Sequence, residues 1–233
     1  MSALIALDHV DTWVFDLDNT LYPAESEVMA QVSERMTLFV MQLLSLDRAD
    51  AYALQKKYLY EYGTTLTGLI ANHELDTDAF LDFTHDVDHD LIDHDPLLVD
   101  HIQKLEGRKI VFTNGSQDHA EKVLARLGLT GAFDDLYDIR SGAFVPKPHM
   151  ESFERFNRRF GINPVSSVMF EDSARNLKTA SELGYTTVLI RAAMHIDGGV
   201  TAGPDDNPDY VHYIADCLRT FLGGYHAQRP TPD

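Results

Sequence analysis

Residues 13–22 read Trp13-Val14-Phe15-Asp16-Leu17-Asp18-Asn19-Thr20-Leu21-Tyr22, and this stretch decides the fold. Residues 12–15 are β-branched and aromatic, the pattern of a strand buried in a parallel sheet. The spacing of Asp16 and Asp18 puts both carboxylates on one side of an extended chain. They would lie at the carboxyl end of the strand, where open α/β sheets bind ligands. Two carboxylates that close repel each other, so one of them must hold a cation or a proton.

The composition restricts the classes of function. The chain has 233 residues, 44% of them hydrophobic, and a formal net charge of -18. This charge repels nucleic acids and anionic membranes, so we expect neither as a partner. Cys217 is the one cysteine, residues 1–11 lack a secretory signal pattern, and no stretch is apolar enough to span a membrane. We therefore expect a cytoplasmic protein, as a monomer or a homodimer.

The strand pattern stops after Tyr22-Pro23. From residue 24 to residue 95 the sequence shows only helical patterns, such as the hydrophobic residues that recur at three- and four-residue steps from Val28 to Leu44. About 70 residues of helix is too long for a crossover and indicates a small helical bundle. We therefore predict a helical cap domain at residues 23–95, inserted after the first strand into a core domain made of residues 1–22 and 96–233.

Strands and helices alternate in the second part of the chain. The predicted strands are residues 109–113, 165–170 and 186–190, with a possible short edge strand at 209–211. The predicted helices are residues 97–105, 116–127 and 173–183, and a last helix that holds Leu218 and Phe221. This alternation predicts an α/β fold with a Rossmann-like parallel sheet and helices on both faces.

Polar residues follow two later strands or stand in a loop beyond them. Residues 113–116 (Thr-Asn-Gly-Ser) open a helix, and their hydroxyls, amide and free N–H groups suit a phosphate. Lys147 stands between two prolines, which restrain its loop. Glu171-Asp172 begins another helix, where acids can bind a hard cation. Each segment also has a simpler explanation, namely an Asx turn at Asp-x-Asp, helix caps, or a solvated lysine.

The coincidence of four such segments at one edge of a sheet favours a ligand site over four separate structural explanations. The candidate metal ligands are Asp16, Asp18 and Asp172. The candidate phosphate ligands are Thr113, Asn114 and Lys147. A Mg²⁺-type cation and a lysine would reverse the local sign of charge and let an acidic protein bind an anionic small molecule.

These segments, in this order, resemble the four motifs of the haloacid dehalogenase superfamily: Asp16-x-Asp18-x-Thr20, Thr113-Asn114, Lys147-Pro148 and Glu171-Asp172. The resemblance spans nearly the whole chain, including a helical cap after the first motif. Three segments are also similar to pyrimidine 5'-nucleotidases: residues 62–66 (Tyr-Gly-Thr-Thr-Leu), Phe112-Thr113-Asn114 followed by His119-Ala120, and Lys147-Pro148-His149. The chain departs from these relatives at Thr67, where they often carry a basic residue.

The resemblance implies a Mg²⁺-dependent phosphomonoesterase. Asp16 would attack the phosphorus to form an aspartyl-phosphate. Asp18 would protonate the leaving oxygen and then deprotonate the attacking water, which calls for a pKa above that of Asp16. Asp16, the backbone carbonyl of Asp18 and Asp172 would hold Mg²⁺, and Glu171 would order a metal-bound water. Lys147, with Thr113 and Asn114, would hold the phosphoryl oxygens.

The resemblance further implies UMP- or CMP-type nucleoside monophosphates as substrates, with specificity supplied by the insert. Tyr22 would lie at the hinge, and the hydroxyls of Thr64 and Thr65 would contact the sugar or base. An ordinary helix–helix turn is the alternative for residues 63–65. Two other functions stay open: a phosphatase or phosphomutase acting on sugar phosphates, and a receiver-like phosphoacceptor module, although receivers are shorter and lack the insert.

Three histidines, His85, His89 and His94, stand among many aspartates. Two of them are four residues apart, a spacing that can bind zinc on a helix. A solvated acidic helix face explains the same pattern, and we expect this second arrangement.

Overall fold

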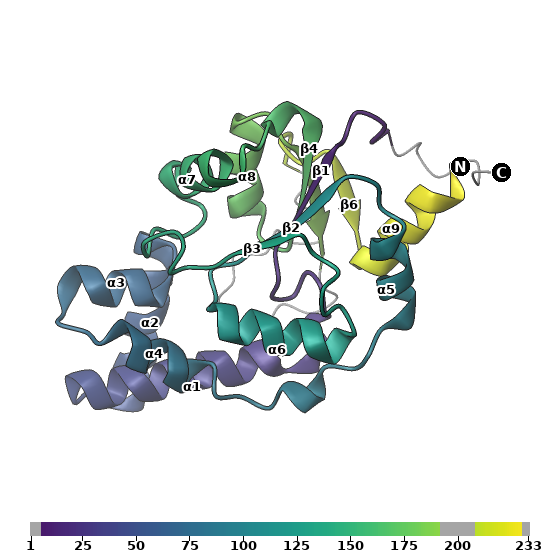
Figure 1. Ribbon diagram of the computed structural model, residues 1–233. Coiled ribbons are helices and arrows are strands. Elements are labelled where there is room, and N and C mark those ends of the chain that lie inside the picture. Colours follow the sequence, from purple (N-terminus) through teal and green to yellow (C-terminus); the bar gives the residue numbers. More distant parts are fainter. Residues whose placement is uncertain (1–5, 192–207, 230–233) are drawn as a thin grey trace.

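A six-stranded parallel sheet forms the centre of the molecule (Figure 1). It is seen in a computed structural model that describes residues 6–191 and 208–229. Its strands are β1 (Thr12–Phe15), β2 (Arg108–Phe112), β3 (Asp135–Tyr137), β4 (Ser167–Glu171), β5 (Thr186–Ile190) and β6 (Tyr213–Ala215). They lie in the order β3-β2-β1-β4-β5-β6. The remainder of the predicted core, residues 1–5, 192–207 and 230–233, lies outside the described residues.

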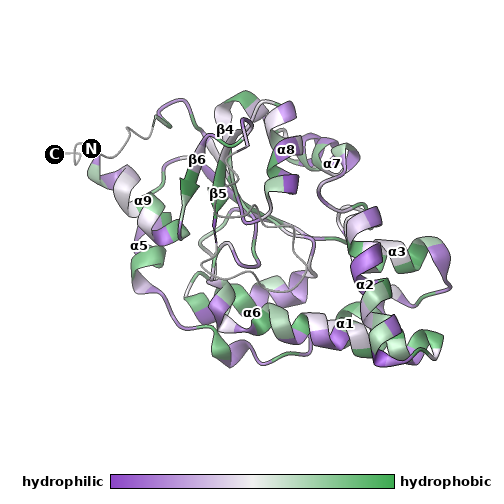
Figure 2. Cartoon of the chain, turned by 180° about the vertical axis from the view of Figure 1, so that it is seen from behind, coloured by the Kyte–Doolittle hydropathy of each residue, from purple (hydrophilic) through white to green (hydrophobic). Residues whose placement is uncertain are grey.

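Helices cover both faces of this sheet, as predicted for a Rossmann-like α/β fold. They are α5 (Pro96–Gln103), α6 (Gln117–Leu127), α7 (Met150–Phe160), α8 (Ala174–Glu182) and α9 (Leu218–Ala227). Alternate residues of a strand point to opposite faces. Trp13 and Phe15 therefore pack with α5, α6 and α9, whereas Val14 packs with α7 and α8. The strands are mostly hydrophobic in Figure 2, as two covered faces require. The predicted fold class is confirmed.

A helical insert separates β1 from α5. It consists of α1 (Val28–Leu44), α2 (Arg48–Tyr62), α3 (Thr65–Asn72) and α4 (Thr77–Thr84), with short 3-10 turns at Ala24–Ser26 and His89–Leu91. These helices enclose a separate hydrophobic cluster, built on buried residues such as Val40, Tyr58 and Phe80 and joined by Ile139 of the core. Figure 1 shows the insert extending from one side of the sheet domain, over the edge where β1 ends.

The sequence missed two elements and misplaced a third. No element was predicted for β3, which has only three residues, or for α7, although Phe153, Phe156 and Phe160 recur at helical spacing. The predicted edge strand at 209–211 was wrong. The strand that pairs with β5 is β6, four residues further on. A strand of three residues carries too little periodicity to be placed from sequence.

The position of β1 in the middle of the sheet brings the polar strand ends together. Phe15 pairs with Val111 of β2 and with Phe170 of β4. The N–H of Asp16 donates to the carbonyl of Phe170 at 2.9 Å, so the pairing continues to the edge. Because all strands are parallel, their carboxyl ends meet at this edge. Among the described residues, no helix combines the length and hydrophobicity needed to cross a membrane.

One glycine allows β2 to start close to β1. Gly107 has φ +90°, and a Cβ there would lie 2.3 Å from the carbonyl oxygen of Asp11. Gly131 also has a positive φ (+74°) but has nothing within 4 Å of such a Cβ.

We predict that Gly131→Ala lowers the free energy of unfolding by about 1 kcal/mol through backbone strain alone. Gly107→Ala should cost roughly 3 kcal/mol, because backbone must also move. Urea unfolding measures both, and equal losses would contradict the clash.

Candidate active site

A buried lysine joins the ends of three strands. The Lys147 ammonium donates to Asp16 Oδ1 after β1, to the Phe112 carbonyl of β2 and to Glu171 Oε2 of β4, each at 2.7 Å. The lysine is 1% exposed. Burial lowers its pKa, but the charges of Asp16 and Glu171 outweigh burial and raise the pKa above its ordinary value. The lysine is therefore a fixed positive charge beside Asp16.

The loop of this lysine is held by Asn114. The Lys147 N–H donates to Asn114 Oδ1 at 2.9 Å, and Asn114 Nδ2 donates to the Lys147 carbonyl at 3.1 Å. The side chain of Asn114, expected to contact phosphate, is thus occupied by the lysine loop. Thr113 is buried, and its hydroxyl accepts a hydrogen bond from the N–H of Gly115 at 2.9 Å.

Three carboxylates form a group suited to a cation. Asp16, Glu171 and Asp172 each offer an oxygen, and these oxygens lie within 4.8 Å of one another. Burial, followed by repulsion from Glu171, raises the pKa of Asp16 to about 7 in spite of Lys147. The same two causes raise the pKa of Asp172 well above its ordinary value. Buried acids that repel one another in this way fit a hard divalent ion, which would offset their charge.

Glu171 was expected to act only through a metal-bound water. Its Oε2 accepts from Lys147, and its Oε1 accepts from the N–H of Ser173 at 3.2 Å. The side chain of Asp172 accepts from Asn19 Nδ2 at 3.3 Å. The side chain of Asp18 does not belong to this group of carboxylates. Its expected metal contact, through the backbone carbonyl, stays a prediction.

The side chain of Asp18 turns instead toward a tyrosine and a histidine. Its Oδ1 accepts from the Tyr22 hydroxyl at 2.6 Å and from His119 Nε2 at 2.8 Å. Burial would raise the pKa of Asp18, but the charge and hydrogen bond of His119 lower it to about 2. The predicted order of the two pKa values is therefore wrong for this structure, where Asp16 has the higher value. The sequence did not show that a histidine contacts Asp18.

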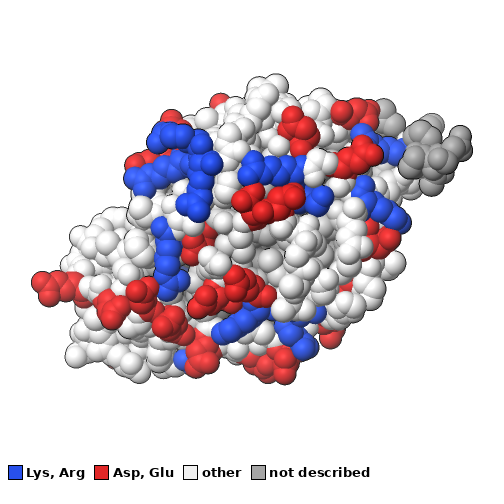
Figure 3. Space-filling model, viewed as in Figure 1, with Lys and Arg blue, Asp and Glu red and all other residues white. Residues whose placement is uncertain are grey.

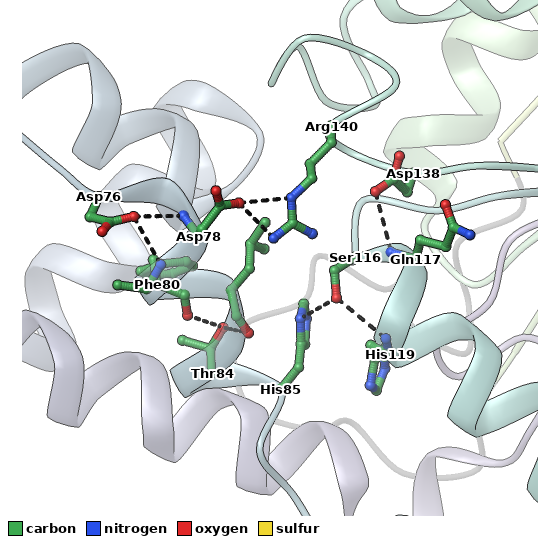
Figure 4. A network of polar contacts seen from close by, with 12 residues as sticks. Asp76, Asp78, Phe80, Thr84, His85, Ser116, Gln117, His119, Asp138 and Arg140 are labelled. Atoms are coloured by element: carbon green, nitrogen blue, oxygen red, sulfur yellow. Dashed lines mark hydrogen bonds and ion pairs between the residues drawn. The ribbon is translucent and has the colours of Figure 1, made fainter.

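The expectation of a solvated histidine face was also wrong. α4 ends at Thr84, so His85 and His89 do not share a helix. His85 is buried, and its Nδ1 lies 2.9 Å from Ser116 Oγ at the start of α6 (Figure 4). Its ring stacks on that of His119 with centroids 4.6 Å apart, and His89 Nε2 lies 3.0 Å from His119 Nδ1. For the position of His119 in this cluster, the one signal in the sequence was the His119-Ala120 pair, which is similar to pyrimidine 5'-nucleotidases.

A cavity of about 300 Å³ lies between the carboxylates and the insert. From the core it is lined by Asp16, Asp18, Asn114, Glu171, Asp172 and Arg175. From the insert it is lined by Lys56, Thr64 and Thr65, and by the apolar side chains of Met29, Val32, Met36, Leu59, Leu66, Phe80 and Leu81. Tyr22 does not line this cavity, and its hydroxyl donates to Asp18, which does.

The turn between α2 and α3 packs on the lysine loop. Gly63 has φ +87°, and a Cβ there would lie 3.1 Å from the carbonyl oxygen of Lys147. Thr64 caps α3, accepting from the N–H of Thr67 at 3.1 Å. The hydroxyl of Thr65 donates to the Gln55 carbonyl at 3.2 Å. The two threonines thus line the cavity while their hydroxyls also hold the turn in place.

Comparisons with known proteins identify the family of this chain. The family model of haloacid dehalogenase-like hydrolases matches residues 10–184, and the chain belongs to this family. Phosphate metabolism protein 8 of Saccharomyces cerevisiae is 27% identical over 192 residues. The match covers 75% of this chain but only 60% of the yeast protein.

Solved structures with low sequence identity share the fold. An HAD phosphatase from Thermococcus onnurineus has a TM-score of 0.59 at 18% identity, covering 92% of this chain and 99% of its own. The HAD-hydrolase YfnB from Bacillus subtilis, bound to magnesium, has a TM-score of 0.59 at 17% identity, with 95% and 99% covered. An L-2-haloacid dehalogenase from Xanthobacter autotrophicus has a TM-score of 0.56 at 17% identity, with 92% and 97% covered.

The raised pKa of Asp16 predicts a pH-dependent stability of the metal-free protein. Between the unfolded value near ~4 and the folded value of about 7, the folded state binds more protons than the unfolded state. The free energy of unfolding must therefore fall as pH rises through this window, by roughly 2–4 kcal/mol from this group. Asp16→Asn should remove that part of the dependence.

Urea unfolding of both proteins in EDTA at several pH values from 4.5 to 7.5 (about the window set by these pKa values) provides the measurement. The comparison with Asp16→Asn subtracts the other titrating groups, including the histidines. Parallel pH profiles for the two proteins would show that burial and Glu171 do not raise the pKa of Asp16.

Proposed function

We propose that this protein is a Mg²⁺-dependent phosphomonoesterase that hydrolyses small phosphate esters through an aspartyl-phosphate at Asp16. The observation that carries the proposal is the fixed Lys147 ammonium, 2.7 Å from Oδ1 of Asp16, a residue that lines the cavity between the core and the insert. A positive charge at this point offsets the charge of a phosphoryl group as it approaches an anionic nucleophile. We infer that residues 23–95 act as a cap domain over a core of residues 1–22 and 96–233.

The proposed reaction has two displacements at phosphorus. In the first, an Asp16 oxygen forms a bond to phosphorus as the ester P–O bond breaks, and Asp18 gives its proton to the leaving oxygen. In the second, Asp18 takes a proton from water, the water oxygen bonds to phosphorus, and the bond to Asp16 breaks. Asp18 must gain its proton before the first step. A phosphate dianion beside it favours that protonated form.

We infer that Asp16, the backbone carbonyl of Asp18, and Asp172 would hold Mg²⁺, with Glu171 supporting the site. A bound Mg²⁺ would supply positive charge to the phosphoryl oxygens and orient the ester. Lys147 would supply a second positive charge to the phosphoryl group, and Thr113 would contact the phosphoryl oxygens. Asn114 would act by holding the lysine loop in addition to any contact of its own. The magnesium bound to the YfnB structure and the fold shared with it support this assignment.

We propose UMP- or CMP-type nucleoside monophosphates as the substrates. A cavity of about 300 Å³ with a largely apolar wall suits a flat base, and lies at the lower end of the range for small-ligand sites. Thr64 and Thr65 would contact the sugar or base, and Tyr22 would act through Asp18. Lys56 and Arg175 line the cavity and can provide the positive charge that Thr67 lacks. The strongly acidic surface and the single cysteine support a cytoplasmic enzyme with no nucleic acid polymer or membrane partner.

Phosphate release from nucleoside monophosphates and sugar phosphates tests this proposal. We expect preference for UMP and CMP with Mg²⁺, loss of release in EDTA, and a loss of roughly 10³-fold or more in Asp16→Asn, which lacks the nucleophile. Glu154→Gln, an exposed acid on α7, is the matched control and should keep full activity.

The outcomes separate the parts of the proposal. Metal-dependent release that favours sugar phosphates would retain the chemistry and reject the nucleotidase assignment. Release that survives in Asp16→Asn would reject Asp16 as the nucleophile. A stable phosphoenzyme with no phosphate release from any ester would identify a phosphoacceptor instead of a hydrolase.

A further inference from the structure

The two oxygens of the Asp18 carboxylate have different surroundings. Both hydrogen bonds that the side chain accepts end on Oδ1, from the Tyr22 hydroxyl at 2.6 Å and from His119 Nε2 at 2.8 Å. Within residues 6–191 and 208–229, no hydrogen bond ends on Oδ2. Asp18 also lines the cavity next to Asp16. The arrangement therefore leaves one oxygen available to a bound ester and fixes the other.

His119 is itself held on two sides. Its outer nitrogen, Nδ1, lies 3.0 Å from His89 Nε2, and its ring stacks on His85 with an interplanar angle of 14°. Ser116 Oγ fixes His85 at 2.9 Å, as Figure 4 shows. His119 is 1% exposed, so its ring has little freedom to turn. A donor whose ring is fixed at one edge and on one face can set the direction of the carboxylate that it contacts.

These histidines come from different parts of the chain. His119 lies on α6 of the core, whereas His85 follows α4 and His89 begins the 3-10 turn that leads back from the insert. Arg140 of the core also bonds Asp78 of α4 at 2.7 Å in this region (Figure 4). The orientation of Asp18 thus depends on how the return connection of the insert lies against α6.

We propose that His119 is a positioning residue that turns the Asp18 carboxylate so that Oδ2 gives the proton to the leaving oxygen, with His89 and His85 setting the ring of His119. This inference rests on the proposed function. The proton moves from Oδ2 to the ester oxygen as that oxygen leaves phosphorus and the Asp16 oxygen bonds to it. His119 gains and loses no proton in this step.

Leaving-group dependence distinguishes positioning from a merely structural role. A nucleoside leaving group needs a proton, whereas p-nitrophenolate leaves without one. Release of the leaving group in a single turnover, with enzyme in excess over UMP or p-nitrophenyl phosphate, reports only the first displacement. We expect His119→Phe, which keeps a ring for stacking but has no donor, to lower the rate with UMP roughly 10²-fold. The rate with p-nitrophenyl phosphate should fall less than about threefold, and separate steady-state measurements should show KM little changed for both esters.

Two further variants and a control keep the test decisive if His119→Phe folds poorly. His119→Gln can place an amide N–H near Nε2 and should recover most of the rate with UMP. His89→Phe should reduce the rate with UMP in the same selective way but by a smaller factor, about 3- to 10-fold. His94→Gln, an exposed histidine in the same segment, should leave both rates unchanged.

Equal losses with both esters, or no loss in any His119 variant, would overturn the inference. A failure of this inference can be told apart from a failure of the proposed function. If only the inference fails, the wild-type protein still hydrolyses UMP, and the Asp16→Asn variant does not. If the proposed function fails, the wild-type protein releases no phosphate from any ester.

Discussion

The hydrogen bonds of one buried ammonium group hold the active site together. Lys147 joins Asp16 after β1, the Phe112 carbonyl of β2 and Glu171 of β4, each at 2.7 Å. A lysine is buried in this way only when its charge is paired, and each carboxylate depends on the lysine in turn. Loss of the lysine would leave Asp16 and Glu171 as neighbouring buried carboxylates without their cation. The three central strand ends and the candidate nucleophile are therefore parts of one electrostatic unit.

This unit explains how a protein of net charge -18 can offer a site for a phosphate ester. Figure 3 shows acidic side chains spread over the insert and the core on the face in view. At the cavity the lysine, and a cation held by Asp16, Glu171 and Asp172, would reverse the local sign. The insert contributes the apolar wall, and its turn at Gly63 packs on the lysine loop. The turn of the insert that borders the cavity therefore packs on the same loop that positions the Lys147 charge.

The sequence predicted the residues whose position follows from the strands that carry them. Asp16 and Glu171 stand at strand ends, and parallel strands bring such ends to one edge, so their proximity to each other was predictable. The contact of His119 with Asp18 spans 101 residues and joins a helix to a strand end, so no local periodicity reports it. The clamp by Asn114 and the low pKa of Asp18 depend on such distant contacts and were missed for the same reason.

We propose that Asp16 becomes phosphorylated during turnover. The most direct measurement is mass spectrometry of enzyme quenched with acid while it turns over UMP, followed by fragmentation of the peptide that contains residues 16 and 18. We expect a mass increase of one phosphoryl group on Asp16, absent when Mg²⁺ is removed and absent in Asp16→Asn. Turnover of UMP with no phosphorylated Asp16 at any quench time, or a phosphoryl group on Asp18 instead, would contradict it.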